Sequence, residues 1–336
     1  MRRRGRRRMA ALSRVPPLPY IGAMPATAKS DALDQQDHSK KGRRAIAALL
    51  VGACLIALAP IFVRLSQTGP TATGFWRLAL ATPFLFAWEL LRGDPRRLPS
   101  RRDLRLLVLA GLMFAGDLAA WHPSIELTSV ANATLLANAA PIFVAAGAWA
   151  WFGERPTAGF VGGLLLAIAG GTLLAKASGT APGRLLGDGL GLLTAVFYAG
   201  YMLAVKVARG SLSTSSVMAG SSLVGAVVLL ALALAFGERV LPRSLDGWTV
   251  LFGLALLSQV FGQGLIAWAI GHLSARFSAL GLLTQTAAAA ALAWGLFGES
   301  FTVLQSIGIM LVAVGLIVAR LADETPAPLA RSRSGV

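Results

Sequence analysis

Two charged side chains interrupt long apolar stretches in the first half of the sequence. Arg77 lies in FWRLALATPF, and Asp117 lies in MFAGDLAAW. Because an ionisable group in the interior of a bilayer costs several kcal/mol, it normally faces a cavity or a charged partner. In membrane helices, Arg77 would lie about 7 to 8 Å from the outer end of its helix and Asp117 about 10 Å from the outer end of the next. The two side chains are therefore expected at a similar depth.

This arrangement leaves two interpretations open. Arg77 and Asp117 could form a fixed ion pair that locks two neighbouring helices together. Alternatively, Arg77 receives an anionic group of a substrate, such as a carboxylate, while Asp117 binds an amine or carries a proton.

Uncharged polar and aromatic side chains in other apolar stretches predict a hydrogen-bonding pocket. A single Asn or Gln in a membrane helix often only links neighbouring helices by a hydrogen bond. Several such residues together favour a pocket. With Arg77 and Asp117, the candidate binding residues are Trp121, His122, Asn132, Asn138, Gln259, Gln263 and Gln285.

The aromatic residues and His122 each allow a structural interpretation. His122 precedes Pro123, which predicts either a break in its helix or a position at the outer membrane interface. Candidates for the pocket wall or for interfacial anchors are Trp76, Trp121, Trp268, Tyr198 and Tyr201.

Glu154 and Glu299 each follow an apolar stretch in the tripeptide Phe-Gly-Glu. They are expected at opposite membrane faces, where they are candidates for gate or loop contacts. The alternative is a solvated carboxylate at the end of a helix.

The elements that must position these residues are membrane-spanning helices. Hydrophobic residues make up 55% of the 336-residue chain and charged residues only 14%, with a mean hydropathy of +0.66. A soluble protein of this size needs a more highly charged surface. Ten apolar stretches have roughly the 20 residues that a spanning helix requires. They cover 45–63, 72–91, 104–121 or a little beyond, 129–152, 157–174, 187–207, 213–236, 247–270, 274–297 and 301–321.

The distribution of basic residues predicts the orientation. The net charge is +16, which by itself could suggest nucleic acid. If the N-terminus is cytoplasmic, twenty-five Lys and Arg residues fall in cytoplasmic segments and five in outer loops. This asymmetry follows the positive-inside rule, so both termini are expected in the cytoplasm, with no nucleic-acid partner.

The second half of the chain repeats the first. Ala148, Trp149 and Phe-Gly-Glu at 152–154 recur 145 positions later as Ala293, Trp294 and Phe-Gly-Glu at 297–299. Five spans in each copy give the copies opposite orientations in the membrane, as in many secondary transporters. Gly163 and Gly170 recur as Gly308 and Gly315, and these glycine faces are expected to be packing seams.

Three stretches carry a family resemblance. SVANATLLANAAPIFVAAGAWAWFGE resembles the fourth helix of an EamA-type repeat of the drug/metabolite transporter superfamily, and LLTQTAAAAALAWGLFGES resembles the fourth helix of a second copy. FWRLALATPF resembles the second helix. The resemblance implies a ten-helix transporter, often an exporter of amino acids, other metabolites or drugs. Thr286 stands where the family's second copy usually has a proline, so a kink there is in question.

The sequence therefore predicts an all-α integral membrane protein with ten transmembrane helices in two inverted five-helix repeats. The expected parts are a basic, disordered cytoplasmic tail (1–44), two repeats (45–176 and 187–321) and a C-terminal cytoplasmic tail (322–336). No Walker loop or dinucleotide-binding motif is present, and the three histidines are too scattered to suggest a metal site. Cys54 is the single cysteine and can form no intrachain disulfide.

We expect a secondary transporter of the inner membrane, with neither enzymatic activity nor a cofactor. Its cargo would be a small polar metabolite, amino acid-like or drug-like, carried by alternating access at a midplane cavity between the repeats. Protons are a candidate coupling ion, and a homodimer is a candidate assembly. The alternative is a non-transporting or channel-like membrane bundle.

Overall fold

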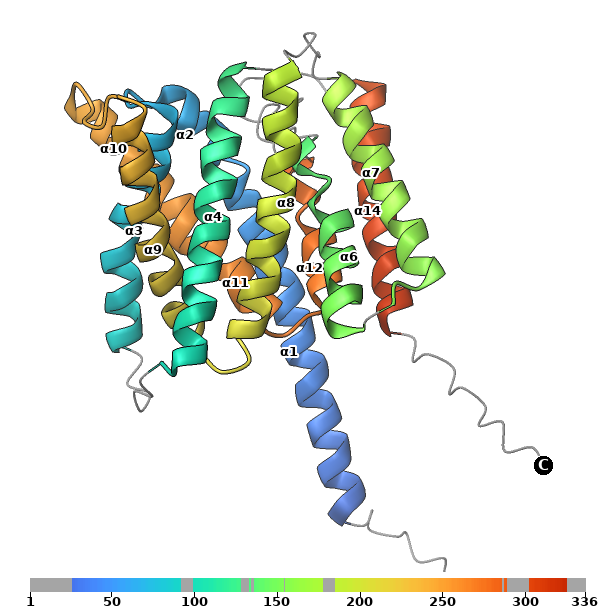
Figure 1. Cartoon of the computed structure of the whole chain (residues 1–336). Helices are drawn as coiled ribbons and strands as arrows, with labels where there is room; N and C mark the ends of the chain where they lie inside the picture. The colour runs from blue at the N-terminus through green and yellow to red at the C-terminus, as the bar shows by residue number, and fades with distance from the viewer. Residues whose placement is uncertain are drawn as a thin grey trace, which may run out of the picture. The chain divides into compact units, whose positions relative to one another are not determined.

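The computed structural model describes residues 26–91, 99–127, 133, 136–153, 155–177, 185–285, 287–288 and 302–324. All regular secondary structure in these ranges is helical (Figure 1). The chain divides into two compact units, 1–41 and 42–336, and the second holds the polar residues singled out above.

The described helices follow the order of the expected spans, and their described ends lie within a few residues of the expected bounds, apart from the start of α1. The first half contains α1 (Ala26–Ile56), α2 (Ala59–Leu65), α3 (Pro70–Leu91), α4 (Arg101–Leu127), α6 (Ala140–Phe152) and α7 (Ala158–Ala177). The second half contains α8 (Leu185–Ala208), α9 (Thr214–Ala235), α10 (Leu245–Gly253), η1 (Leu254–Gln263), α11 (Gly264–Ile270), α12 (Ala275–Gly281) and α14 (Val303–Glu324).

Helix α1 begins earlier than expected. The polar composition of residues 1–44 predicts a disordered tail, whereas the helix already includes residues 26–44. No glycine or proline occurs between Ala26 and Lys41, so no residue of that segment breaks a helix.

Among the described residues, five helical segments are long and apolar enough to cross a bilayer, and three shorter apolar helices accompany them. A membrane core leaves no water for exposed backbone groups, so the helices satisfy their amides internally. The long segments cover 41–65, 101–127, 185–208, 214–235 and 245–270.

Three spans are interrupted within the membrane region. Turns at Ala57–Leu58 and Asn138–Ala139 precede Pro60 and Pro141, which cannot donate the hydrogen bond that would continue the helix. A third turn at Leu282–Leu283 has no proline. Thr286 itself lies outside the described residues, but the second copy has its interruption three residues before it.

Segment η1 is a π-helix of ten residues in the middle of a span. Its i to i+5 hydrogen bonds widen each turn relative to an α-helix, and such segments are frequent at functional sites. It carries Ser258, Gln259 and Gln263, all of them buried. The apolar stretch 247–270 by itself predicts one regular spanning helix here.

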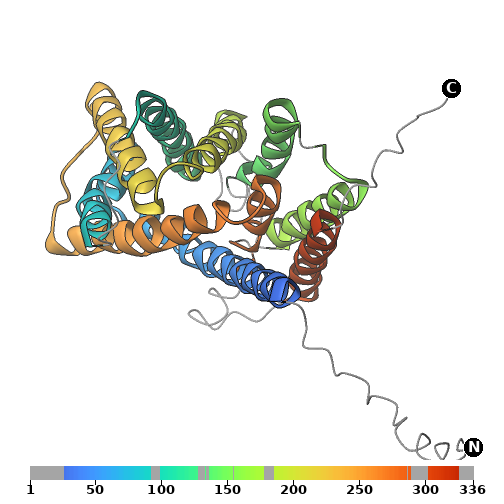
Figure 2. The same ribbon diagram turned by 90° about the horizontal axis from the view of Figure 1, so that it is seen from below.

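The expected glycine seam is confirmed. Helices α7 and α14 run side by side in both views (Figures 1 and 2). A Cβ atom on Gly163 would lie 2.5 Å from the backbone oxygen of Gly315, and one on Gly170 would lie 2.6 Å from that of Gly308. The backbones approach so closely because neither helix carries a side chain at these crossings.

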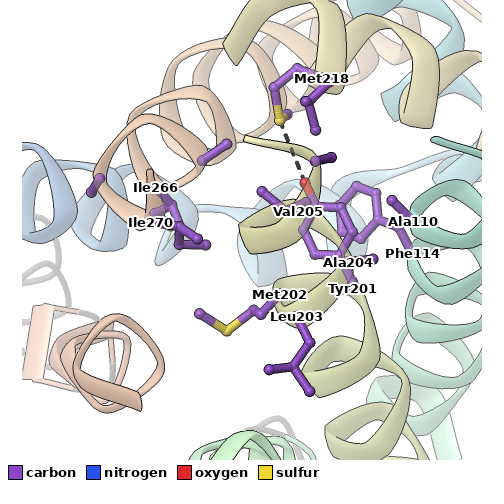
Figure 3. Close-up of a cluster of buried hydrophobic side chains, with 14 of the residues drawn as sticks. Ala110, Phe114, Tyr201, Met202, Leu203, Ala204, Val205, Met218, Ile266 and Ile270 are labelled. Atoms are coloured by element: carbon purple, nitrogen blue, oxygen red, sulfur yellow. Dashed lines mark hydrogen bonds between the residues drawn. The ribbon is translucent and has the colours of Figure 1, made fainter. Parts of the chain in front are cut away.

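A second set of helices encloses the main apolar core. Helix α4 packs against α8 and α9, and α3 packs against α9. In the core, Phe114 of α4 stacks on Tyr201 of α8 with ring centroids 4.4 Å apart. The Tyr201 hydroxyl donates a 3.4 Å hydrogen bond to the sulfur of Met218 on α9 (Figure 3). These contacts hold α3, α4, α8 and α9 together around the polar residues described next.

Helices α3 and α9 are also linked by a carboxylate at each end. Glu238, just after α9, accepts hydrogen bonds from the backbone N–H groups of Thr71 (3.2 Å) and Ala72 (2.8 Å) at the start of α3. At the other end, Glu89 of α3 accepts hydrogen bonds from the hydroxyl groups of three serines at the start of α9. These are Ser213 (2.6 Å), Ser216 (2.7 Å) and Ser215.

Candidate functional site

Both halves of the chain line one polar cavity. The first half contributes Ile56, Arg77, Asp117, Leu118, Trp121, Ala137, Asn138, Ala140 and Pro141. The second half contributes Thr194, Tyr198, Ala279, Leu282, Leu283 and Gln285. The cavity has a volume of ≈ 80 Å³. Sites for drug-sized ligands measure about 300 to 1,000 Å³, so a ligand of that size requires the walls to move apart.

The three helix interruptions meet at this cavity. Ile56 precedes the turn in the first span, Asn138 lies in the turn before α6, and Leu282 and Leu283 form the turn after α12. Interrupted helices expose backbone polar groups, which a cavity can accommodate but lipid cannot. Broken helices near the bilayer midplane are a common device for substrate sites in secondary transporters.

Arg77 is buried on α3, with 2% of its surface exposed, and lines the cavity. Its Nε–H group donates a 3.1 Å hydrogen bond to the side-chain oxygen of Gln259 on η1. Its guanidinium carbon lies 5.6 Å from the centre of the Phe114 ring, within the range of a cation–π interaction. Gln259 and Phe114 thus both contact the guanidinium group.

Asp117 lies on α4 and is 6% exposed, and it lines the same cavity. Arg77 and Asp117 attract each other electrostatically, but no ion pair within 4.0 Å joins them. Within the described part of the chain, the Asp117 carboxylate also accepts no hydrogen bond. The cavity is therefore lined by one basic and one acidic side chain that are not directly paired.

The other candidate residues separate into two groups. Trp121, Asn138 and Gln285 line the cavity with Arg77 and Asp117. Gln259 and Gln263 lie behind it: Gln259 contacts Arg77, and the oxygen of Gln263 accepts a 3.4 Å hydrogen bond from the hydroxyl of Tyr198. Asn132, Glu154 and Glu299 lie outside the described residues.

The structure corrects the expected helix break at His122. Helix α4 continues through Pro123 to Leu127, so no break occurs at this point, and His122 is fully buried in the protein. Its Nδ1 atom lies 2.9 Å from the backbone oxygen of Pro70. His122 therefore connects α4 to the first turn of α3 and does not line the cavity.

Two tryptophans also lie away from the cavity. Trp76 donates a 2.7 Å hydrogen bond from Nε1 to the backbone oxygen of Val240 and contacts Trp248 edge-on. Trp268 lies against His272, with ring centroids 4.5 Å apart. Trp121 and Tyr198 remain as aromatic walls, while Tyr201 is buried one turn beyond Tyr198.

Sequence reasoning missed several contributing residues. Thr194 lines the cavity, Phe114 contacts Arg77, and Ser222 accepts a hydrogen bond from Gln259.

Glu238, which contacts the start of α3, belongs to a motif that is visible in the sequence. Residues 236–238 form a third Phe-Gly-Glu tripeptide, and Gly153 and Gly237 both adopt left-handed backbone conformations (φ 69° and 65°). A left-handed glycine ends a helix and turns the following residue back toward its neighbours.

The described residues form helices in two halves that share one polar cavity, which is the plan of many membrane transporters. The model of the EamA-like transporter family matches residues 43–175 and 185–321, so the chain belongs to this family. Each match is one repeat, and five spans in each give the two repeats opposite orientations.

Two curated relatives and a solved structure resemble the chain. The pseudopaline exporter CntI of Pseudomonas aeruginosa, from strains UCBPP-PA14 and PAO1, is 28% identical over 207 residues, which are 61% of this chain and 70% of CntI. A crystal structure with 22% sequence identity superposes with a TM-score of 0.68 and covers 84% of this chain and 98% of its own. At that identity the structure supports the fold alone.

The family and the apolar helices together establish a multi-pass membrane protein that transports small molecules. The family consists of transporters rather than enzymes. The bilayer is accordingly the solvent for the exposed apolar faces of the helices.

Proposed function

We propose that the protein exports a small polar metabolite that carries both an anionic and a cationic group. The observation that carries this proposal is the presence of Arg77 and Asp117 in one cavity without a direct ion pair. The guanidinium would receive a carboxylate, for which its planar array of donors is suited. Asp117 would bind an amine or take up a proton, and Asn138 and Gln285 would complete the hydrogen bonds.

Alternating access between the two repeats would carry the substrate across the membrane. Both repeats supply walls of the cavity, and the cavity volume of ≈ 80 Å³ is too small for a drug-sized cargo unless the walls separate. The direction is inferred from the relatives, because CntI is described as an exporter. Pseudopaline is the cargo of that relative, and the proposal for this chain extends only to the charge pattern of the cargo.

The test begins with an untargeted comparison of metabolites in the medium of deletion and overexpressing strains. Compounds that increase with the protein are then measured by counterflow in proteoliposomes. A carrier accelerates uptake of labelled compound when unlabelled compound is trapped inside.

Arg77→Met should abolish counterflow. The control is Arg64, an exposed arginine at the end of α2, and Arg64→Met should leave counterflow intact. A protein that changes no metabolite, or that shows leak without counterflow, would contradict the proposal and favour a channel-like bundle.

Proton coupling forms a separate part of this proposal. Asp117 is the carboxylate that lines the cavity in the described residues, so it would be the group that takes up a proton in one state and releases it in the other. Flux under an imposed pH gradient with clamped voltage compares the intact protein with Asp117→Asn. Uphill accumulation that persists in the Asn variant would exclude Asp117 as the proton carrier. Active exchange without any gradient-driven accumulation would indicate a uniporter.

A further inference from the structure

The separation of Arg77 from Asp117 needs a physical cause. In the low dielectric of a buried site, opposite charges attract far more strongly than in water. Guanidinium and carboxylate groups also fit each other as paired hydrogen-bonding partners, which is the stable arrangement when nothing else holds them. Because the two groups share one cavity without such contact, other residues must hold at least one of them in place.

Gln259 is the residue that holds Arg77. Arginine can only donate hydrogen bonds, so the amide oxygen of Gln259 must face the Arg77 Nε–H group, as observed at 3.1 Å. The amide nitrogen then points away, and it donates a 3.2 Å hydrogen bond to the hydroxyl of Ser222 on α9. Both polar ends of Gln259 are thereby occupied.

Burial distinguishes Gln259 from a substrate ligand. Gln259 and Ser222 are both fully buried, and neither lines the cavity. The chain of hydrogen bonds from Ser222 through Gln259 to Arg77 crosses from α9 and η1 in the second repeat to α3 in the first. The Phe114 ring, with its centre 5.6 Å from the guanidinium carbon, is a second contact that limits the movement of Arg77.

We propose that Gln259, oriented by Ser222, is a positioning residue that keeps the Arg77 guanidinium apart from Asp117. Each charge then stays open to the cavity for a ligand with a carboxylate and a cationic group, an inference that extends the proposed function above. Without Gln259, the guanidinium turns toward Asp117, and the two charges neutralise each other before a ligand can bind.

Gln263 provides the matched control. It has the same side chain, lies one turn further along the same π-helix and is also buried, but its oxygen accepts a hydrogen bond from Tyr198 instead of Arg77. Gln263→Leu therefore removes a buried amide from η1 without releasing the guanidinium.

The first experiment measures the coupling between Arg77 and Asp117 by a double-mutant cycle. Arg77→Met, Asp117→Asn and the double variant are unfolded at equilibrium in mixed detergent micelles, in the wild-type, Gln259→Leu and Gln263→Leu backgrounds. The interaction between Arg77 and Asp117 multiplies the folding equilibrium constant by a coupling factor. This factor should be at least about fivefold larger in the Gln259→Leu background than in wild type. It should be unchanged in the Gln263→Leu background. Equal coupling in all three backgrounds would overturn the proposal.

The second experiment requires no variant of either charge. The probe is 2,3-butanedione, which reacts with the terminal nitrogens of arginine, and mass spectrometry gives the modification rate of Arg77 relative to buried Arg276 in the same molecule. In Gln259→Leu this relative rate should fall about fivefold or more, because Asp117 now occupies those nitrogens. Adding Asp117→Asn to Gln259→Leu should restore the rate, a result that a purely structural role would not produce.

Several outcomes would contradict the proposal. A relative rate that does not fall in Gln259→Leu, an equal fall in Gln263→Leu, or no recovery with Asp117→Asn would each exclude the positioning role. Neither experiment uses a transported compound. If the transport proposal fails, both measurements can still be interpreted. If the positioning role of Gln259 fails, counterflow still tests transport.

Discussion

At the scale of single residues, burial decides which polar groups can meet a substrate. Arg77 and Asp117 reach the cavity, whereas His122, Gln259 and Ser222 are enclosed by protein. A buried polar group that is hydrogen-bonded stabilises a particular arrangement of helices, and its removal leaves its partner unpaired. The enclosed residues therefore act on the cavity through what they hold.

The position of His122 leads to a prediction about stability. His122→Ala removes the contact with the Pro70 backbone oxygen and leaves a void in a fully buried site, so it should cost about 2–4 kcal/mol of unfolding free energy. Transport per folded molecule should stay near the wild-type value. Unfolding in detergent and counterflow on purified protein measure the two effects separately.

His272 is a suitable control for this variant. Its Nδ1 atom lies 2.8 Å from the backbone oxygen of Trp268, but the side chain is exposed. His272→Ala should therefore change stability by less than about 0.5 kcal/mol. A His122→Ala protein that is stable but inactive would show that His122 takes part in binding after all.

At the scale of elements, close contacts between helices depend on small residues and on caps at the helix ends. The α7–α14 contact has glycines of one helix against the backbone of the other. The α3–α9 contact has a carboxylate at each end. Glu89 of α3 accepts hydrogen bonds from the start of α9, and Glu238, just after α9, accepts hydrogen bonds from the start of α3. Both contacts join an element of one repeat to an element of the other.

The glycine seam predicts different effects for two neighbouring glycines. A Cβ atom on Gly163 would lie 2.5 Å from a backbone oxygen of α14, whereas one on Gly162 would have no atom within 4 Å. Gly163→Ala should therefore destabilise the protein by about 1–3 kcal/mol. Gly162→Ala should be neutral or stabilise by up to about 1 kcal/mol, because alanine favours the helix. Thermal unfolding in detergent compares them, and equal effects would place the seam elsewhere.

The carboxylate at the start of α3 gives a further prediction. Glu238 accepts two backbone N–H groups there, where the helix dipole also favours a negative charge. Glu238→Ala should cost about 1–2 kcal/mol and speed hydrogen exchange at the amides of Thr71 and Ala72. Exposed Glu126 at the end of α4 serves as the control, and Glu126→Ala should leave these amides protected. Unchanged exchange in Glu238→Ala would show that other groups cap α3.

At the scale of the whole molecule, the two repeats share one cavity, and the interrupted spans reach it from both sides. An arrangement of this kind allows one half to move against the other while the site stays between them. The orientation of the molecule in the membrane follows from charge and not from the fold, so it requires its own test.

Topology is tested by reporter fusions at both ends and in loops. Fusions after residue 324 and in the loop around residue 95 should report a cytoplasmic position, because basic residues gather in those segments. Fusions in the loop at 179–183 should report the outer side. An external C-terminus would contradict the even number of spans, since ten spans return the chain to its starting side.

The membrane class, the repeat and the α7–α14 seam follow from the sequence alone, and the sequence also singles out Arg77 and Asp117 as candidate site residues. All of these depend on local composition or on a fixed offset between similar segments, and a charge in an apolar stretch is conspicuous wherever the helix faces. Apart from the start of α1, the described ends of the spans lie within a few residues of the prediction, because a bilayer requires a minimum apolar length.

Only the tertiary structure decided what each polar side chain touches. Arg77 and Gln259 are 182 positions apart, and their contact depends on how α3 and η1 are rotated against each other. The π-helical winding of η1, the turn at Leu282–Leu283 without a proline, and the burial of His122 likewise depend on neighbouring helices. Local sequence preferences differ by at most about 1 kcal/mol per residue, apart from proline, so packing between distant segments overrides them.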